Sequence, residues 1–394
     1  MAPIKSVTAR PILDSRGGWT VEATICLVNN LRATASVPQG ESTGSLEAVS
    51  LPAAEAVRNV NEIIGPALQR MAVGEQTAID QRLLELDGTA LKSKFGGNAL
   101  LAVSLVAARA AALADQLPLW QYLRELSDFS VPAGLAPRLV ALMMEGGLHA
   151  PGASPFQEYL ILLRSRVISE SVSLVERLYC ELRERLKHQF GPTVSRVGDE
   201  GAFAPAVTDP AEPFALLGQV VKDLSLEDQL DFGLDAAANN VDWSIEELFK
   251  FYRQLRAHYP LRYLEDPFAE TDFANFARLH TEFGDSTLVV GDDLTVTNVA
   301  RLAEAKQAGS INAVIIKPNQ IGTLTETLEA IRRAREYGWQ IIVSHRGRET
   351  NDDFIADLAY GVGADGIKLG APARGERVAK YNRLLAIEAE AAAF

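Results

Sequence analysis

The sequence predicts an α/β protein in which a (β/α) barrel follows a smaller α+β cap domain. Three observations lead to this prediction. Six apolar runs in the second half of the chain each stop at a polar residue, the stops recur at regular intervals, and the first third instead has strands followed by helices. Intervals of this length suit one strand plus one helix per unit.

The six stops fall at residues 235, 265, 292, 317, 345 and 368, so the intervals are 30, 27, 25, 28 and 23 residues. Parallel strands of a barrel end on one face, where barrel enzymes have their active sites. The alternative is a doubly wound open sheet with ordinary charged loops. We favour the barrel because open sheets concentrate their chemistry at one switch point rather than at every strand end.

The first 130 residues should form the cap. Strands are expected at 4–9, 19–28 and 32–37, with a hairpin turn at Asn29-Asn30, and helices at about 52–65, 76–87 and 98–123. A proline-containing linker at 131–138 then leads into the barrel domain, so the predicted domains are 1–130 and 131–394.

The barrel domain opens less regularly than it continues. A strand at 139–143 precedes a glycine loop that holds His149, and a second strand begins at Gln157-Glu158. A long helix at 169–188 is followed by a glycine-bounded loop that contains Glu200. Each of these polar residues is only a weak functional signal when it is taken alone.

Composition restricts the partners. The 394 residues carry a formal net charge of −13, which argues against free nucleic acid or an anionic membrane as a partner.

The two cysteines have no metal-type spacing, and no signal-peptide pattern precedes the first strand. The apolar segment 99–114 is too short to span a bilayer and predicts a buried helix. We therefore expect a cytoplasmic protein.

Asp235, Glu265 and Asp292 end three successive strands and so are expected to be neighbours. Unpaired, they would repel one another, whereas a divalent cation would remove that cost, and oxygen ligands suit Mg²⁺. The alternative is ion pairing with Lys or Arg.

Lys317 and Lys368 end later strands, and carboxylate-bound Mg²⁺ opposite lysines fits abstraction of a proton beside a carboxylate. Ser344, His345 and Arg346 offer groups that bind phosphate. Glu200 is a candidate for the opposing general acid.

With these residues in place, the sequence resembles the enolase family over nearly the whole chain. The matching strings include 12–17 (ILDSRG), 42–44 (STG), 157–158 (QE), 198–201 (GDEG), 264–267 (LEDP), 291–298 (GDDLTVTN), 319–323 (NQIGT), 344–346 (SHR) and 370–374 (GAPAR). The family has an α+β cap before an irregular (β/α)8 barrel, and its superfamily is known for a Lys or His base with one or two Mg²⁺ ions.

The resemblance implies roles for individual residues. Asp235, Glu265 and Asp292 would hold Mg²⁺, and Ser42 on a mobile loop would close over a second ion. Lys317 would take the α-proton of 2-phosphoglycerate, and Glu200, helped by Glu158, would protonate the leaving hydroxyl. The remaining residues would line the site. Lys368 would contact the substrate carboxylate, and Ser344, Arg346 and Gly347 would contact the phosphate. Gln157, His149 and His345 would surround them. A homodimer or higher homo-oligomer is implied as well.

Several residues depart from the family pattern, among them Glu41 in the loop before Ser42, Leu148 in place of a serine, Ala202 in place of a glycine, and Gly347 in place of a serine that contacts phosphate. They leave two hypotheses open. One is a divergent enolase acting on 2-phosphoglycerate and phosphoenolpyruvate. The other is a paralogue of the carboxyphosphonoenolpyruvate synthase type, which transfers phosphonoformate from a CMP carrier to enolpyruvate in phosphonate biosynthesis. A non-catalytic binding protein is a minor third hypothesis, because no predicted catalytic residue is lost.

Overall fold

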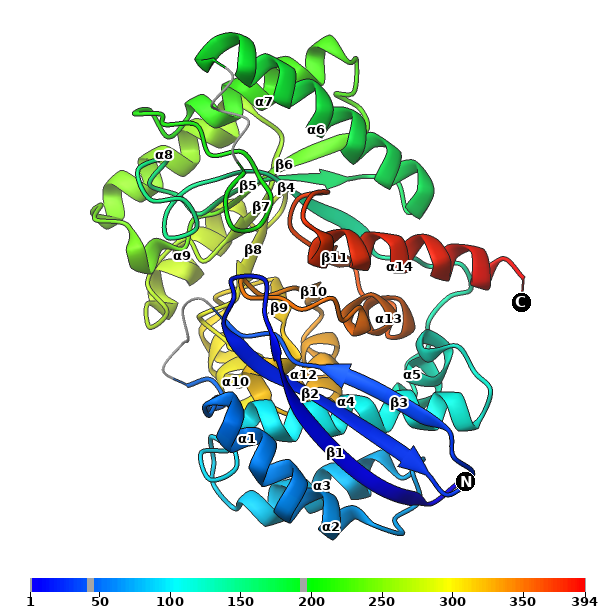
Figure 1. Cartoon of the computed structure of the whole chain (residues 1–394). Helices are drawn as coiled ribbons and strands as arrows, with labels where there is room; N and C mark the ends of the chain where they lie inside the picture. The colour runs from blue at the N-terminus through cyan, green and yellow to red at the C-terminus, as the bar shows by residue number, and fades with distance from the viewer. Residues whose placement is uncertain (1, 41–45, 192–196, 394) are drawn as a thin grey trace.

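The computed structural model describes residues 2–40, 46–191 and 197–393 (Figure 1). Its N-terminal part begins with three antiparallel strands in the order β1 (Ile4–Leu13), β2 (Trp19–Leu27) and β3 (Arg32–Ser36). Buried residues such as Val21, Ala23 and Ile25 alternate with more exposed ones along β2, as a sheet with one covered face requires. Asn30 has a φ of 67° in the turn before β3, a conformation that asparagine tolerates.

Helices cover this sheet. They are α1 (Ala53–Asn59), a π-helical turn (Val60–Ile64), α2 (Gly65–Leu68), α3 (Gln76–Asp87), α4 (Gly97–Ala114) and α5 (Leu119–Ser127). The single helix expected at 98–123 is wrong, because the chain leaves the helix at Asp115 and starts a new one after Pro118. Proline disfavours a helical conformation in the residue before it, here Leu117, and suits the start of the next helix.

Helix α4 is long and strongly apolar. By length and composition alone its 18 residues would suffice to cross a membrane, although the apolar segment was expected to be too short. However, 83% of that segment is buried inside the protein, between β2 and β3 on one side and helices of the barrel on the other. This burial confirms the expectation of a core helix.

The second part of the chain is a closed barrel. Its strands are β4 (Arg138–Glu145), β5 (Glu158–Leu163), β6 (Leu230–Asp235), β7 (Leu261–Glu265), β8 (Leu288–Gly291), β9 (Ala313–Ile316), β10 (Gln340–Ser344) and β11 (Gly366–Lys368), and β11 closes the barrel by pairing with β4. Strand β5 runs antiparallel to both of its neighbours, and all other pairs are parallel. The barrel is therefore confirmed, and the open-sheet alternative is wrong.

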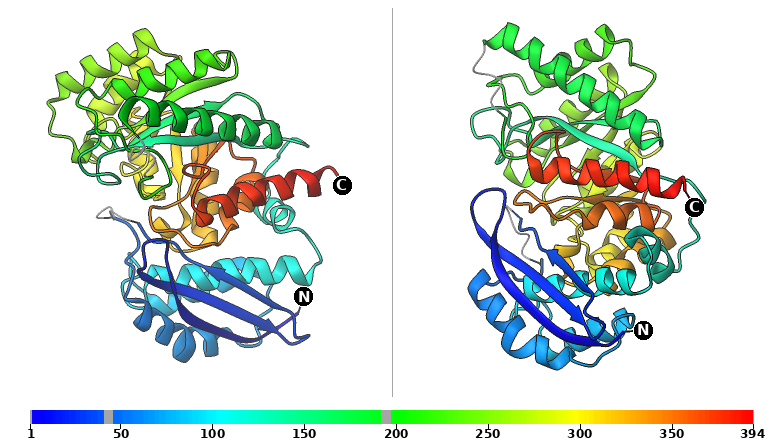
Figure 2. Two further views of the ribbon diagram at one scale, coloured as in Figure 1. Left: turned by 45° about the horizontal axis from the view of Figure 1, so that its top comes forward. Right: turned by 45° about the vertical axis from the view of Figure 1, so that its right-hand side comes forward.

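The outer layer of the barrel is helical (Figure 2). It comprises α6 (Ile168–Phe190), α7 (Glu212–Asp223), α8 (Ile245–His258), α9 (Phe273–Phe283), α10 (Val299–Ala308), α11 (Pro318–Ile321), α12 (Leu324–Glu336), α13 (Phe354–Gly361) and α14 (Gly375–Ala391), with a 3₁₀ turn at Ala238–Asn240. In α12, Leu324, Leu328 and Ile331 lie buried on one face, as their spacing predicts.

The N-terminal part packs against the barrel on the side of β9 and β10 (Figure 1). Asp80 accepts hydrogen bonds from the backbone N–H and the hydroxyl of Thr325, and Arg109 pairs with Asp352 at 2.9 Å. Gln39 forms a β-bridge with Arg348 beside the barrel rim. These contacts bring the chain that follows β3 to the rim. The boundary between 130 and 131 stays a prediction.

Candidate active site

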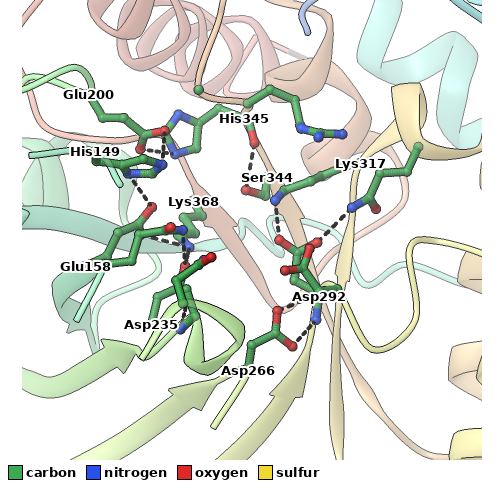
Figure 3. Close-up of a pocket in the computed structure, with 17 residues that line it drawn as sticks. His149, Glu158, Glu200, Asp235, Asp266, Asp292, Lys317, Ser344, His345 and Lys368 are labelled. Carbon is green, nitrogen blue, oxygen red and sulfur yellow. Dashed lines mark hydrogen bonds and ion pairs between the residues drawn. The ribbon is translucent and has the colours of Figure 1, made fainter. Parts of the chain in front are cut away.

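One cavity at the carboxyl-terminal face of the barrel gathers nearly all of the predicted site residues (Figure 3). Its lining includes His149, Gln157, Glu158, Glu200, Asp235, Asp292, Lys317, Ser344, His345, Arg346, Gly347 and Lys368. Glu265 does not line the cavity, but its carboxylate contacts Lys368 at the cavity wall. Ser42 and Glu41 lie outside the described residues.

The reversed direction of β5 explains how Glu158 reaches this face. Because β5 runs against its neighbours, its first residue lies where β4 and β6 end. Glu158 is therefore in register with Glu145 on one side and with Asp235 on the other, and Asp235 is in register with Glu265 of β7. Four acids from four adjacent strands thus form one row along the rim.

Lys368, at the end of β11, comes from the strand next to β4 and reaches this row with its side chain. Its Nζ atom is 2.8 Å from Glu158, 3.0 Å from Asp235 and 2.9 Å from Glu265. Burial opposes a charge on Lys368, but the carboxylates outweigh it and raise its pKa well above the usual range. Burial and the nearby Asp235 raise the pKa of Glu265 to about 8. Three buried carboxylates therefore share one ammonium group.

Asp292 follows β8 and contacts Lys317, the first residue after β9, in an ion pair. Gln320 also donates a hydrogen bond of 2.9 Å to Asp292. Burial favours the neutral carboxyl, but Lys317 outweighs it and lowers the pKa of Asp292. Burial likewise opposes a charge on Lys317, and Asp292 reverses this and raises the pKa of Lys317. In this arrangement Lys317 is an ammonium ion.

The donor atoms fit a hard divalent cation. Asp235, Glu265 and Asp292 offer only oxygens, are buried, and follow three successive strands. Around Lys368 three carboxyl groups meet only one ammonium, and an additional cation would favour the charged form of these groups. The three residues thus suit Mg²⁺ by chemistry and position, and their role as ligands stays a prediction.

Within the part of the chain that the structure describes, two groups of side chains bring possible metal-ligand atoms close together. His149, Glu158 and Glu200 form one group, and Asp266, Asp292 and Asp293 form the other, each with ligand atoms within 4.8 Å of one another. Asp235, Glu265 and Asp292 are not among these groups; Lys368 contacts the first two, whereas Lys317 and Gln320 contact the third.

Glu200 lies on the opposite side of the cavity from Lys317 (Figure 3). Its Oε2 atom is 3.2 Å from His345 Nε2, and its Oε1 atom is 3.9 Å from His149 Nε2. Burial raises the pKa of Glu200, but the two histidines and nearby cations outweigh burial and lower it. For Glu158 burial prevails and raises the pKa well above the usual range. Neighbouring carboxyl groups are thus held in different protonation states, a pattern typical of acid–base sites.

The predicted phosphate residues are already engaged with the protein. Arg346 forms two hydrogen bonds with Glu47, of 2.9 and 3.2 Å, and a third with Asn319. The hydroxyl of Ser344 donates to the carbonyl oxygen of His345. Glu47 belongs to the N-terminal part of the chain, so this buried pair links the two parts at the rim.

Sequence reasoning assigned no role to Glu47, Glu145, Asp266, Asp293 and Gln320, all of which contact or line the site. Asp266 stands next to Glu265, and its carboxylate accepts the backbone N–H groups of Asp292 and Asp293. Position beside a predicted ligand was a usable signal for Asp266 and Asp293. No local pattern identifies Glu47, because its partner is 299 residues away.

We expect Glu47→Gln to lower the free energy of unfolding by about 3 kcal/mol, because a neutral amide replaces the buried carboxylate that pairs with Arg346. Urea unfolding measures this change. Glu62→Gln, at an exposed position of the same part of the chain, is the control and should shift stability by less than about 0.5 kcal/mol. Equal effects in the two variants would show that the pair contributes no stability.

We expect Glu145→Gln to change how stability depends on pH. Burial and Glu200 raise the pKa of Glu145 to about 8, from 4.5 in an exposed chain. Between these values the folded state holds a proton that the unfolded state has lost, so stability falls as pH rises through this window. The glutamine of the variant stays neutral, so its stability should not fall over this pH window. Near the upper end of the window the variant should gain about 1 kcal/mol or more in free energy of unfolding relative to the wild type.

Urea unfolding of the wild type and of Glu145→Gln at both ends of the window measures this difference. Glu227→Gln, at an exposed position, should follow the wild type. Parallel curves for Glu145→Gln and the wild type would contradict the raised pKa.

The closed barrel, with opposed lysine and glutamate side chains at its carboxyl-terminal face, defines a class of enzyme that moves protons to and from a small substrate. Comparison with known families agrees. The model "Enolase, N-terminal domain" matches residues 4–123, and "Enolase, C-terminal TIM barrel domain" matches residues 136–243 and 238–393. The chain belongs to the enolase family.

Full-length relatives give the same result. The chain is 38% identical to Enolase B of Dictyostelium discoideum, covering 98% of this chain and 95% of the relative. It is 40% identical to the enolases of Methanopyrus kandleri (100% and 97% covered) and Methanocaldococcus jannaschii (98% and 95%). The protein is therefore an enzyme, a lyase of the enolase superfamily, and not a non-catalytic binding protein. The phosphonoformyl-transfer alternative is not favoured, since these relatives are all named enolases.

Proposed function

We propose that the protein interconverts 2-phosphoglycerate and phosphoenolpyruvate with Mg²⁺ as its cofactor. The observation that carries the proposal is the placement of Lys317 and Glu200 on opposite sides of one cavity, with carboxylates and Lys368 between them (Figure 3). A base and an acid on opposite sides suit removal of a proton from one carbon and of a hydroxyl from the next.

Asp235, Glu265 and Asp292 would hold the metal. When bound, Mg²⁺ supplies positive charge that stabilises the carboxylate dianion formed on loss of the α-proton. One or two ions per site are compatible with the proposal, because the residue predicted to contact a second ion, Ser42, lies outside the described residues.

Lys317 is the proposed base, and it must be neutral to accept the α-proton. Burial already favours the neutral amine, and the contact with Asp292, together with a smaller effect of Glu265, keeps the pKa of Lys317 high. If Asp292 serves as a metal ligand, that contact is lost, and burial together with nearby Arg346 lowers the pKa of Lys317. The C–H electron pair then moves into the carboxylate as Lys317 takes the proton.

Glu200 and Glu158 act on the leaving hydroxyl in the second step. The electron pair held in the carboxylate forms the C=C bond, the C–O bond breaks, and the hydroxyl takes a proton to leave as water. Glu158, whose pKa is raised, carries a proton, and Glu200 is held by His345 and His149 beside it. The proton passes from this pair to the hydroxyl.

The remaining residues bind the substrate. Lys368 contacts the substrate carboxylate, and Arg346, Ser344 and the backbone of Gly347 bind the phosphate. Gln157 donates to Asp235 at 3.4 Å and would keep that carboxylate in place. Domains at 1–130 and 131–394, a homodimer or higher homo-oligomer, and a cytoplasmic location complete the proposal.

The test is an assay with purified protein followed by phosphorus NMR. With Mg²⁺, 2-phosphoglycerate should be converted to phosphoenolpyruvate, and removal of divalent cations by a chelator should stop the reaction. No conversion in the presence of Mg²⁺ would refute the proposal. A parallel sample with a cytidylyl phosphonoformate donor identifies the transferase, because a new product that retains the donor's C–P bond would form only there.

A further inference from the structure

Arg377, in the first turn of α14, is a buried cation to which the mechanism above gives no part. Its side chain has no exposed surface, and it lies behind the cavity wall rather than in it. The Nη1 atom is 2.7 Å from His345 Nδ1 and 2.6 Å from the carbonyl oxygen of Arg346. The Nη2 atom donates to the carbonyl oxygen of Gly347 at 2.7 Å. One guanidinium therefore holds three consecutive residues of the predicted site.

The chemistry of the guanidinium determines the protonation of the histidine ring. Arginine carries only N–H donors and keeps its proton at any physiological pH, so the atom facing it must accept. Nδ1 of His345 is therefore the unprotonated nitrogen, and the proton of the neutral ring is on Nε2. That nitrogen is 3.2 Å from Glu200 Oε2, so its N–H faces the carboxylate. The opposite tautomer would direct the lone pair of Nε2 at the carboxylate of Glu200. It would also face the N–H donors of Arg377 with another N–H, on Nδ1.

The ring of His345 has little freedom to turn away from this arrangement. It is buried, and a side-chain carbon at Gly370 would lie only 3.0 Å from its Cε1 atom. The backbone N–H of His345 is also bound, at 3.0 Å, to the carbonyl oxygen of Lys368. The ring is packed in place, with a hydrogen bond from Arg377 on one side and the carboxylate of Glu200 facing it on the other.

We propose that Arg377 is a positioning residue that fixes the Nε2–H tautomer of His345 and thereby orients Glu200 toward the leaving hydroxyl. Arg377 acts through His345 and does not contact the substrate. The effect on Glu200 rests on the proposed function, whereas the tautomer itself does not. The same residue holds the carbonyl groups of Arg346 and Gly347, so it also supports the backbone of the predicted phosphate site.

Nitrogen-15 NMR of the histidine-labelled full-length protein tests the tautomer without substrate. The chain has five histidines, and the His345→Gln variant assigns the signal of interest by its loss. We expect one ring nitrogen, Nδ1, to show the shift of an unprotonated acceptor and Nε2 to show that of a protonated donor. A ring protonated on Nδ1, or on both nitrogens, would overturn the proposal whatever the substrate proves to be.

Variants test whether Arg377 is the cause. Arg377→Met should give mixed tautomers and lower kcat for dehydration about ten- to hundredfold, a range typical of residues that orient a functional group indirectly. Arg377→Lys keeps one cationic donor and should restore the Nε2–H tautomer and part of kcat. An unchanged tautomer in Arg377→Met would overturn the proposal. If Arg377→Met does not fold, the nitrogen-15 spectrum of the wild type still tests which ring nitrogen of His345 carries the proton.

Lys380 supplies the matched control. It lies one turn further along α14, is equally buried, and pairs with Glu349 at 2.9 Å without contacting His345. Lys380→Met should lower stability but leave the His345 signal unchanged. A tautomer change in this variant as well would show that any lost buried cation in α14 has the effect, which would overturn the assignment to Arg377.

Discussion

Replacing Lys317 with alanine should abolish exchange of the α-proton of 2-phosphoglycerate with solvent. Lys317 is the partly buried amine beside Asp292, and a positioned base of this kind contributes about 10²- to 10⁴-fold to a rate. The measurement is proton NMR of the substrate in D₂O with Mg²⁺ present, in which the α-proton signal disappears as exchange proceeds. Dehydration should fall by at least as much as exchange, because it follows proton removal.

Lys250→Ala is the control for this experiment. Lys250 is exposed on α8, so removal of its charge should leave both rates unchanged. Exchange at the wild-type rate in Lys317→Ala would show that another group is the base, and the cavity would then need a different orientation of substrate.

Glu200→Gln should separate the two steps of the reaction. The amide keeps the size of the side chain but can neither carry nor pass on a proton, so dehydration should fall about 10²- to 10⁴-fold. Exchange of the α-proton should continue, because Lys317 lies on the opposite side of the cavity (Figure 3). The same NMR sample reports both rates, one from the α-proton and the other from phosphoenolpyruvate.

Asp199→Asn provides the comparison within the same loop. Asp199 is partly exposed and pairs with Arg16 at 3.1 Å, so its loss should leave the dehydration rate close to that of the wild type. If Glu200→Gln lost exchange and dehydration to the same degree, Glu200 would belong to the first step, and the proposed division of roles would be wrong.

Patterns that repeat along the chain were predictable from the sequence. Each strand from β6 to β11 is a short apolar run buried in the barrel wall, so its end is marked by the first functional polar residue, as at Asp235 and Lys317. The shared face of these ends follows from the parallel order of the strands. The predicted site residues that the structure describes therefore lie in or beside one cavity, although several of their individual roles were implied only by the family resemblance.

Features that depend on distant partners were not predictable. The reversed direction of β5, which brings Glu158 to the rim, leaves no mark in its own residues. The pair of Glu47 with Arg346 joins the two parts of the chain, and Arg377 reaches His345 from the last helix. In each case three-dimensional packing, and not local pattern, selects the partner.

The position of a bound metal tests the central claim most directly. A crystal grown with Mn²⁺, which shares the oxygen ligands of Mg²⁺, would locate the ion by anomalous scattering. We predict an ion in contact with carboxylate oxygens of Asp235, Glu265 and Asp292, with Lys317 released from Asp292. An ion held instead by His149, Glu158 and Glu200, or by Asp266, Asp292 and Asp293 without the other two ligands, would contradict the account.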